Sequence, residues 1–307
     1  MQMTPFNTPL ILSGPLRMPR QMLADQEYGG HHSVHDDKTA AKLGFSGAPI
    51  EGPTHFSQFD PLLTQLWGDA WFERGCLSVH FTNMVVEGEE VRAFVELPSA
   101  ESASARCWAE KSDGTKVLEA SASIGPEHGE TLLEKRLQRF SNAEQLVILE
   151  DLAVGMRGSA DENVIMQPDQ HLGALYPFTL NQKLAVITEN APYYTDATAS
   201  PWGKAIIPME MVSVLAAYTF KDADFKIKEP VIGLFADLEI RMIKGPLFVS
   251  TPYVVRREIV KLTESRRTES CWIRTRIYDD SGSELLADTL LNHAFMKASY
   301  PHYPKNA

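Results

Sequence analysis

The feature of the sequence that most constrains the fold is an order of elements that occurs twice. In each half of the chain, a helix candidate is followed by four strand-like runs in which apolar and polar residues alternate. The runs cover 76–87, 90–97, 104–111 and 116–124 in the first half, and 231–244, 252–263, 269–278 and 284–296 in the second. The halves are offset by about 160 residues, and the run DGTKVLEAS aligns with SGSELLADT. We therefore expect two copies of one structural unit.

Turn residues predict how the strands are connected. Gly88 lies between the first two runs and predicts a hairpin there. Asp113-Gly114 predicts a second hairpin, because both central residues of a type I′ turn need a positive φ. In the second half, residues 279–282 join the last two runs in the same way. Each half is therefore expected to be an antiparallel sheet.

The longest helix candidate of the first half begins at Gly52 and Pro53, which suit the N-cap and N1 positions, and continues to Leu66. Pro61 should kink this helix or split it, with Asp60 capping the second piece. The second half has its helix at about 209–220. One helix can cover the apolar face of each four-stranded sheet, which predicts the α+β class.

The repeats divide the chain into three parts. We expect a first repeat at 1–125, a linker at 126–160 with little strand propensity, and a second repeat at 161–307. The two repeats should pair their sheets edge to edge or their helices face to face, which would make an internal pseudo-dimer.

Composition excludes several classes of protein. The formal net charge of -11 argues against nucleic acid as a partner. No run approaches the roughly 18 consecutive apolar residues that are needed to cross a bilayer. The first 20 residues lack the basic segment followed by an apolar segment that is typical of a secretory signal peptide. We therefore expect a cytoplasmic protein without a membrane partner. Cys76, Cys107 and Cys271 are far apart, which argues against disulfides and a thiolate zinc site.

The segment 28–37 concentrates groups that can move protons. It contains His31, His32 and His35, followed by Asp36 and Asp37. Imidazoles beside carboxylates can form a general acid/base pair. A metal site is the weaker interpretation, because the HxxH spacing lacks the helical HExxH context. A polar loop without chemistry is the alternative.

The residues that follow this segment extend the pattern. A short helical stretch at 38–43 precedes Gly44-Phe45, and then Pro49-Ile50 and Gly52 lead into the long helix. This order resembles the MaoC-like (R)-specific enoyl-CoA hydratase/dehydratase family, in which DxNPxHxD precedes a GFxxPIxHG-type segment. A degenerate copy of the DxNPxHxD stretch lies at 189–196 and has Tyr194 in the place of the histidine. The resemblance implies a double hot-dog fold with a degenerate second repeat.

The sequence departs from the family pattern at the carboxylate and at one histidine. Gly30 stands where the family has an Asp five residues before His35, although Glu27 stands five residues before His32. Glu51 occupies the position of the histidine that precedes the family's glycine. The sequence therefore leaves the carboxylate partner open among several residues of the loop.

The resemblance implies an enoyl-thioester hydratase or dehydratase that uses His/carboxylate acid-base catalysis. The candidate catalytic residues are His35, Asp37, His32, Glu27, His31 and Asp36. The residues expected to hold the thioester oxygen are Gly52, Pro53 and Thr54, at the start of the helix. The expected partner is an acyl-CoA or acyl-carrier thioester, with no metal and no cofactor besides the coenzyme A of the substrate. The expected assembly is a homo-oligomer or the internal pseudo-dimer.

Two other functions fit the same fold. An acyl-CoA thioesterase would use a helix carboxylate such as Asp60 or Glu210 to activate water. A non-catalytic acyl-thioester-binding or scaffold protein would need no acid/base pair. The sequence favours structural roles for His55 and His80, which are expected at a helix start and on an alternating strand.

Overall fold

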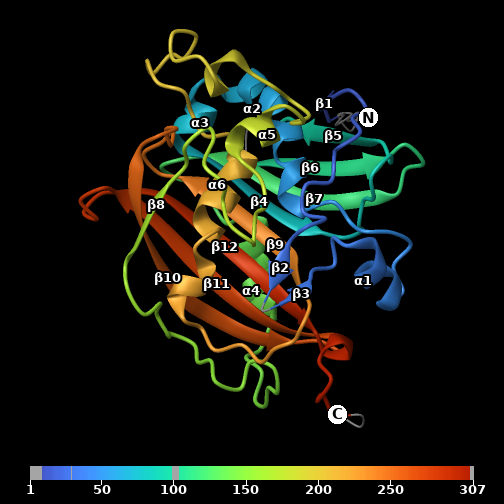
Figure 1. Cartoon of the computed structure of the whole chain (residues 1–307). Coiled ribbons are helices and arrows are strands. Elements are labelled where there is room, and N and C mark those ends of the chain that lie inside the picture. Colours follow the sequence, from blue (N-terminus) through green and yellow to red (C-terminus); the bar gives the residue numbers. More distant parts are fainter. Residues whose placement is uncertain (1–8, 29, 99–103, 305–307) are drawn as a thin grey trace, which may run out of the picture.

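The protein is built on one large antiparallel sheet. The computed structural model describes residues 9–28, 30–98 and 104–304. Ten strands lie in the order β1-β5-β6-β7-β4-β9-β12-β11-β10-β8 (Figure 1). The first half contributes β1 (Ile11–Ser13), β4 (Gly75–Phe81), β5 (Val91–Glu96), β6 (Ser104–Lys111) and β7 (Lys116–Ile124). The second half contributes β8 (Glu162–Ile165), β9 (Gly233–Met242), β10 (Pro252–Glu264), β11 (Thr268–Asp279) and β12 (Leu285–Met296).

The hairpins predicted at the Asp-Gly and Ser-Gly turns are present. β6 pairs with β7 and β11 pairs with β12, and the turn glycines Gly114 and Gly282 both have a positive φ. The hairpin predicted around Gly88 is wrong, because β4 pairs with β7 and β9 while β5 pairs with β6 and β1. Gly88 does lie in a turn, where the Glu89 amide donates to the Val86 carbonyl, but this turn belongs to a longer connection.

The two halves meet edge to edge at β4 and β9. Residues 76–80 of β4 pair in antiparallel register with residues 237–241 of β9. On either side of this seam the strand order is mirrored, since β4-β7-β6-β5 in one direction corresponds to β9-β12-β11-β10 in the other. The predicted α+β architecture of two joined helix-plus-sheet repeats is therefore confirmed. The boundaries at residues 125 and 160 stay a prediction.

Short helices line the sheet. The first half contains α1 (Asp37–Lys42), η1 (Gly52–His55), η2 (Ser57–Phe59), α2 (Asp60–Trp67) and α3 (Ala70–Arg74). The linker contains α4 (Leu132–Arg139), and the second half contains α5 (Leu180–Leu184), η3 (Pro192–Tyr194), α6 (Met209–Ala217), η4 (Phe220–Ala223) and η5 (Lys297–Ser299). Among the described residues, none of the helices has the length and apolar content needed to span a bilayer.

The helix predicted after Gly52 is split, as Pro61 suggested, but Asp60 does not cap the second piece. The Asp60 side chain makes no hydrogen bond to the start of α2. Instead, its carboxylate accepts hydrogen bonds from the Trp71 indole at 2.9 Å and from the Tyr194 hydroxyl at 3.1 Å. A buried carboxylate needs such donors, and this need takes precedence over the cap.

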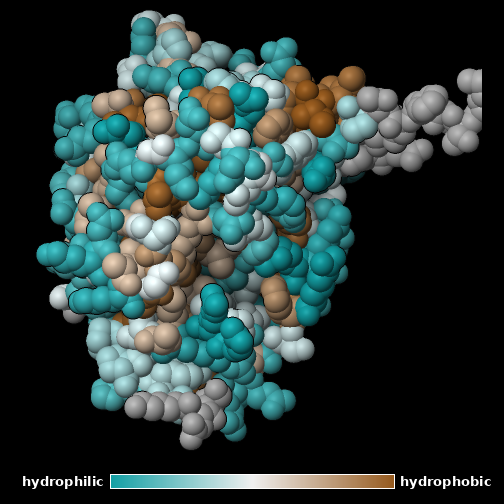
Figure 2. Space-filling view, turned by 90° about the vertical axis from the view of Figure 1, so that its right-hand side faces the viewer, coloured by the Kyte–Doolittle hydropathy of each residue, from teal (hydrophilic) through white to brown (hydrophobic). Residues whose placement is uncertain are grey.

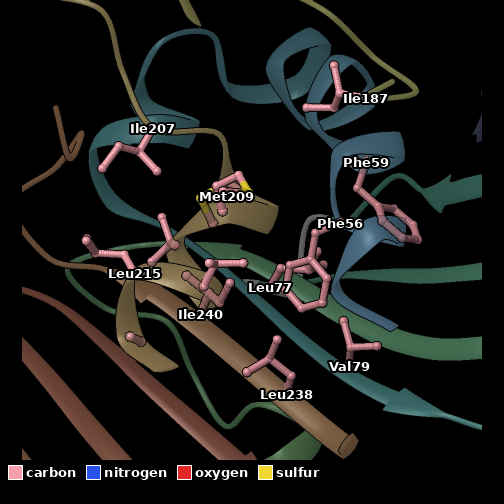
Figure 3. Packing of buried hydrophobic residues seen from close by; sticks show 14 of the residues in the cluster. Phe56, Phe59, Leu77, Val79, Ile187, Ile207, Met209, Leu215, Leu238 and Ile240 are labelled. Atoms are coloured by element: carbon pink, nitrogen blue, oxygen red, sulfur yellow. The ribbon is translucent and has the colours of Figure 1, made fainter. Parts of the chain in front are cut away.

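The main core lies under the seam and is shared by both halves. Leu77 and Val79 of β4 and Leu238 and Ile240 of β9 belong to one buried cluster with Phe56 (Figure 3). We call the face of the sheet that carries these side chains, together with α2 and α6, the inner face. Because the cluster crosses the seam, neither half has this core to itself.

The linker helix α4 packs on the opposite face of the seam, which we call the outer face. The Leu133 amide donates to the Ser78 hydroxyl at 3.0 Å, and the Thr131 hydroxyl donates to Glu239 at 2.6 Å. Thr131 and Glu134 also form a capping box at the start of the helix. The segment predicted as a linker therefore covers the joint between the repeats.

The surface is largely hydrophilic in the view of Figure 2. Large exposed apolar side chains are few among the described residues, and Leu10, which is 66% exposed, is one of them. Leu10 is therefore a suitable reference for the buried leucines of the seam.

Truncation of a seam leucine should destabilise the protein strongly. Leu77→Ala is expected to lower the free energy of unfolding by about 2–5 kcal/mol, because Leu77 is fully buried between the repeats. The matched variant Leu10→Ala should change it by less than about 0.5 kcal/mol. Equilibrium denaturation of both variants provides the measurement, and equal effects would contradict a core centred on the seam.

Candidate functional site

A cavity of about 390 Å³ lies where the two halves meet. Its walls come from the N-terminal segment, from residues 49–55, from the ends of β4 and β9, from α4, and from the turn between β10 and β11. Both halves of the sheet and α4 therefore contribute to one site.

The cavity exists because β4 and β9 separate. Their pairing stops at His80 and Asp237, after which β4 continues along β7 and β9 continues along β12. An irregularity between Asn292 and His293 in the β9–β12 register bends β9 at this point. His80 and Phe81 point to opposite faces because side chains alternate along a strand, yet both line the cavity. The cavity therefore passes through the sheet, from the inner face to the outer face.

His35 lines the inner part of this cavity and is held in one tautomer. Its Nδ1 lies 2.6 Å from the Pro49 carbonyl oxygen, which can only accept a hydrogen bond, so Nδ1 carries the proton. Nε2 is then the basic nitrogen of a neutral imidazole. Burial lowers the pKa of His35 to about 4, although the Pro49 carbonyl opposes this shift. His35 is therefore neutral and oriented near pH 7.

Glu51 is the carboxyl group of the inner cavity. It is 7% exposed, and its Oε2 has no hydrogen-bond partner within the described part of the chain. Lys183 of α5 is also buried and forms an ion pair with Glu210 at 3.3 Å. Burial raises the pKa of Glu51, and the nearby Lys183 only partly opposes this. One ammonium group serves two carboxyl groups, and burial raises the pKa of both Glu51 and Glu210.

Gly52 supplies a backbone donor beside these two side chains. Its N–H has no partner among the described residues, whereas the N–H of Thr54 donates to the Glu51 carbonyl. A Cβ at Gly52 would lie 2.8 Å from the Phe81 ring, so a side chain there would displace the cavity wall. Pro53 also lines the cavity but has no N–H to donate.

Thr54 does not reach the cavity, contrary to expectation. Its hydroxyl accepts a hydrogen bond from the buried Lys183 ammonium at 2.8 Å. Thr54 therefore anchors the second repeat to the first and leaves Gly52 as the donor of this turn.

The carboxylates predicted from the His-rich loop lie outside the cavity. Asp36 caps α1, and the hydrogen bonds from Thr39 lower its pKa. Asp37 is exposed and accepts from the Ala48 amide at 3.0 Å. Glu27 is exposed on the small ribbon of β2 (Glu27–Tyr28) and β3 (His31–His32).

The expected pairing of a loop histidine with a loop carboxylate is therefore absent from the described residues. His31 and His32 lie on the ribbon and outside the cavity lining, and His35 is bonded to a carbonyl. Asp36 and Asp37 instead accept hydrogen bonds from nearby backbone amides, as short polar side chains beside the start of a helix commonly do.

A different histidine has a carboxylate partner. His80 Nδ1 lies 2.7 Å from Asp237 Oδ1, across the seam. The fully buried Asp237 also accepts from Arg136 Nε at 2.9 Å and from Asn292 Nδ2 at 2.7 Å. All four residues line the outer part of the cavity. No sequence pattern links His80 to Asp237, because only strand pairing brings them together.

His55 also lines the cavity, at its inner end. It is buried, and burial lowers its pKa to about 4, so it is neutral near pH 7. Its Nδ1 lies 3.5 Å from Gln58 Nε2, which is a weak interaction. Nothing orients His55 as firmly as Pro49 orients His35.

The carboxylates of the thioesterase alternative do not line the cavity. Both oxygens of Asp60 are taken by Trp71 and Tyr194, and burial raises its pKa to about 7. Glu210 is buried in its ion pair with Lys183. Neither side chain is placed to activate a water molecule in this cavity.

A second cavity of about 270 Å³ adjoins the first on the inner face. Tyr28, Tyr176 and Phe235 line both cavities and mark the boundary between them. The walls of the second cavity are mainly aromatic and aliphatic, including Phe220 and Phe295. Within the described ranges, no three His, Cys, Asp or Glu side chains are arranged to hold a metal ion.

Comparisons with known proteins bear on the fold. No protein-family model and no curated protein matches the sequence. Among solved structures, a protein of Chloroflexus aurantiacus described as a MaoC domain dehydratase is similar, with 12% identity, 95% of each chain covered and a TM-score of 0.60. A Mycobacterium tuberculosis protein with a double hotdog fold matches at 12% identity and a TM-score of 0.56, with 95% of this chain and 97% of that chain covered. The chain has the predicted double hot-dog fold.

The state of His35 can be tested by NMR on protein with ¹⁵N-labelled histidine. We expect the ring to be neutral, with its proton on Nδ1, and to titrate near pH 4 because burial disfavours the charged form. The spectrum of His35→Gln identifies the signal by its loss. A proton on Nε2, or titration near 6.5, would contradict the geometry described above.

Proposed function

We propose that the protein hydrates 2-enoyl thioesters, or catalyses the reverse dehydration. The observation that carries this proposal is the composition of the inner cavity. A neutral imidazole with a free Nε2, a carboxyl group whose pKa is raised by burial and a free backbone N–H line this cavity, at His35, Glu51 and Gly52. These are the base, the acid and the oxyanion donor that the reaction needs.

The reaction balances with these groups alone. His35 Nε2 takes a proton from water as its oxygen bonds to C3 of the enoyl group. The Gly52 N–H donates to the thioester oxygen, where negative charge develops, and Glu51 then gives its proton to C2. One proton has moved from water to His35 and another from Glu51 to the product, so transfer from His35 back to Glu51 restores the site. The dehydration follows the same steps in reverse.

The surroundings of the site support an acyl substrate. The aromatic second cavity begins at Tyr28 and Tyr176, beside the inner site, and is suited to an apolar acyl tail. The dehydratase of Chloroflexus aurantiacus that shares this fold supports the same class of reaction. We propose acyl-CoA or an acyl-carrier thioester as the substrate, a cytoplasmic location, and no metal or further cofactor.

The alternatives are less well supported. A thioesterase would need Asp60 or Glu210 in the cavity, and both are bonded elsewhere. A scaffold protein would not need a carboxyl group in the cavity lining, where Glu51 Oε2 is buried without a hydrogen-bond partner among the described residues at a cost in stability. A role of Glu51 in catalysis would explain why this destabilising side chain is present.

Loss of either proton-transfer group should remove most of the activity. His35→Gln and Glu51→Gln are each expected to lower kcat for crotonyl-CoA hydration by about 10²- to 10⁴-fold, as for other general acids and bases. The measurement follows the loss of enoyl absorbance together with release of free thiol. The matched control His31→Gln, outside the cavity, should keep wild-type activity. Thiol release without hydration would instead indicate a thioesterase.

The pH dependence of kcat/KM should reflect the burial of His35 and Glu51, which shifts the pKa of each. On the acid side, kcat/KM is expected to stay constant down to about pH 5 and to fall near pH 4, since His35 must be neutral to act as the base. On the alkaline side, the rate should fall as Glu51 loses its proton, above the ordinary pKa of a carboxyl group. An acid limb near 6.5 would exclude His35 as the base, and a Glu51→Gln variant that keeps the alkaline limb would exclude Glu51 as the acid.

A further inference from the structure

The outer part of the cavity is a polar compartment with its own set of unsatisfied groups. Asn292 is 7% exposed, and its Oδ1 has no hydrogen-bond partner within the described part of the chain. Its Nδ2 donates to Asp237, so the orientation of the amide is fixed and Oδ1 is the free acceptor. A buried acceptor without a donor in the protein is free to accept a hydrogen bond from an N–H or O–H group of a ligand.

Donors lie next to this acceptor. Arg136 uses Nε to bind Asp237, and its two Nη atoms have no hydrogen-bond partner among the described residues. His80 uses Nδ1 to bind the same carboxylate, which leaves Nε2. Asp237 holds all three side chains in place, so the compartment is preorganised. Free donors and a free acceptor together suit a ligand that carries amide groups.

The path of a thioester through the molecule follows from the two cavities. If Gly52 binds the thioester oxygen, the acyl tail can enter the aromatic cavity on the inner face. The group attached to the thioester sulfur must then reach the protein surface by a different opening. The first cavity provides one, because it continues between the separated ends of β4 and β9 to the outer face.

We propose that the phosphopantetheine arm of the thioester passes through the sheet between β4 and β9 and is bound on the outer face. An amide N–H of the arm donates to Asn292 Oδ1, and Arg136 and His80 contact its amide carbonyls or phosphate. The turn between β10 and β11, together with Thr268 at the start of β11, forms the far wall. This inference rests on the proposed function and assigns a binding path to the arm of its substrate. Coenzyme A and acyl carrier protein present the same arm.

The test uses a variant with a larger side chain inside the proposed passage between β4 and β9. Ala236 lies at the bend of β9, between Phe235 and Asp237, and lines the cavity. Ala236→Leu is expected to raise KM for crotonyl-CoA at least about tenfold, while leaving kcat/KM for the armless S-ethyl thiocrotonate within about twofold. Ala153→Leu, an equal change at an exposed loop position, should alter neither value. Equal losses with both substrates would overturn the proposal.

Two further variants keep the test decisive if Ala236→Leu does not fold. Thr268→Trp narrows the outer opening at the edge of the cavity, and Arg136→Gln removes the free guanidinium donors. Each should raise KM for crotonyl-CoA and spare the ethyl thioester. An unchanged KM for crotonyl-CoA in both variants would place the arm elsewhere. A lower KM of the wild type for crotonyl-acyl carrier protein than for crotonyl-CoA would identify the carrier protein as the source of the arm.

A binding measurement separates this inference from the proposed function. If the wild type hydrates no thioester, the proposed function fails, and calorimetry with the non-reactive thioether S-butyl-coenzyme A still tests the passage. Ala236→Leu and Thr268→Trp should then each raise its Kd at least about tenfold relative to Ala153→Leu. A Kd that neither variant changes, or no binding by the wild type, would overturn the proposal.

Discussion

Residues 76–80 of β4 and 237–241 of β9 pair across the seam, and this one antiparallel contact joins two half-sheets into a continuous sheet. The inner face of the seam carries Leu77 and Leu238 into the shared core, and the outer face receives α4. The contact is also short. Because it ends at His80 and Asp237, the strands separate and leave the space that becomes the cavity. The same interaction therefore determines the stability of the fold and the position of the site.

The site depends on groups that are costly to bury. Glu51, Lys183 and Glu210 come from both repeats, and the two acidic side chains share one ammonium group in the interior. Burial disfavours the charge on Lys183, but Glu210 and Glu51 together raise its pKa. Such a cluster contributes little to stability compared with apolar residues of the same volume. Its value lies in raising the pKa of the Glu51 carboxyl group in the cavity where burial lowers that of His35, and acid-base catalysis depends on such opposite shifts.

The sequence predicted the elements better than their contacts. Alternation and turn residues located β6 and β7 and the Asp113-Gly114 hairpin, because these signals are local. The wrong hairpin at Gly88 shows the limit of such signals, since a turn residue does not reveal that β4 is buried between β7 and β9. His35 could be found from its neighbours in the sequence. Asp36 could not be excluded from them, because capping α1 and pairing with a histidine use the same side chain.

The missed residues have a common cause. His80 and Asp237, like Glu51 and Lys183, meet only through tertiary structure, and no spacing rule connects them. Of these residues, only Glu51 could have been singled out from the sequence, because it stands where the family that the sequence resembles has a histidine.

The central claim is that the inner cavity binds the thioester group between His35 and Gly52. A crystal structure of Glu51→Gln with bound crotonyl-CoA tests it most directly, because the slow variant should retain its substrate. The account predicts the thioester oxygen about 3 Å from the Gly52 nitrogen, with a water molecule between His35 Nε2 and C3 of the acyl group. An acyl group bound outside this cavity, or a thioester oxygen directed away from Gly52, would contradict it.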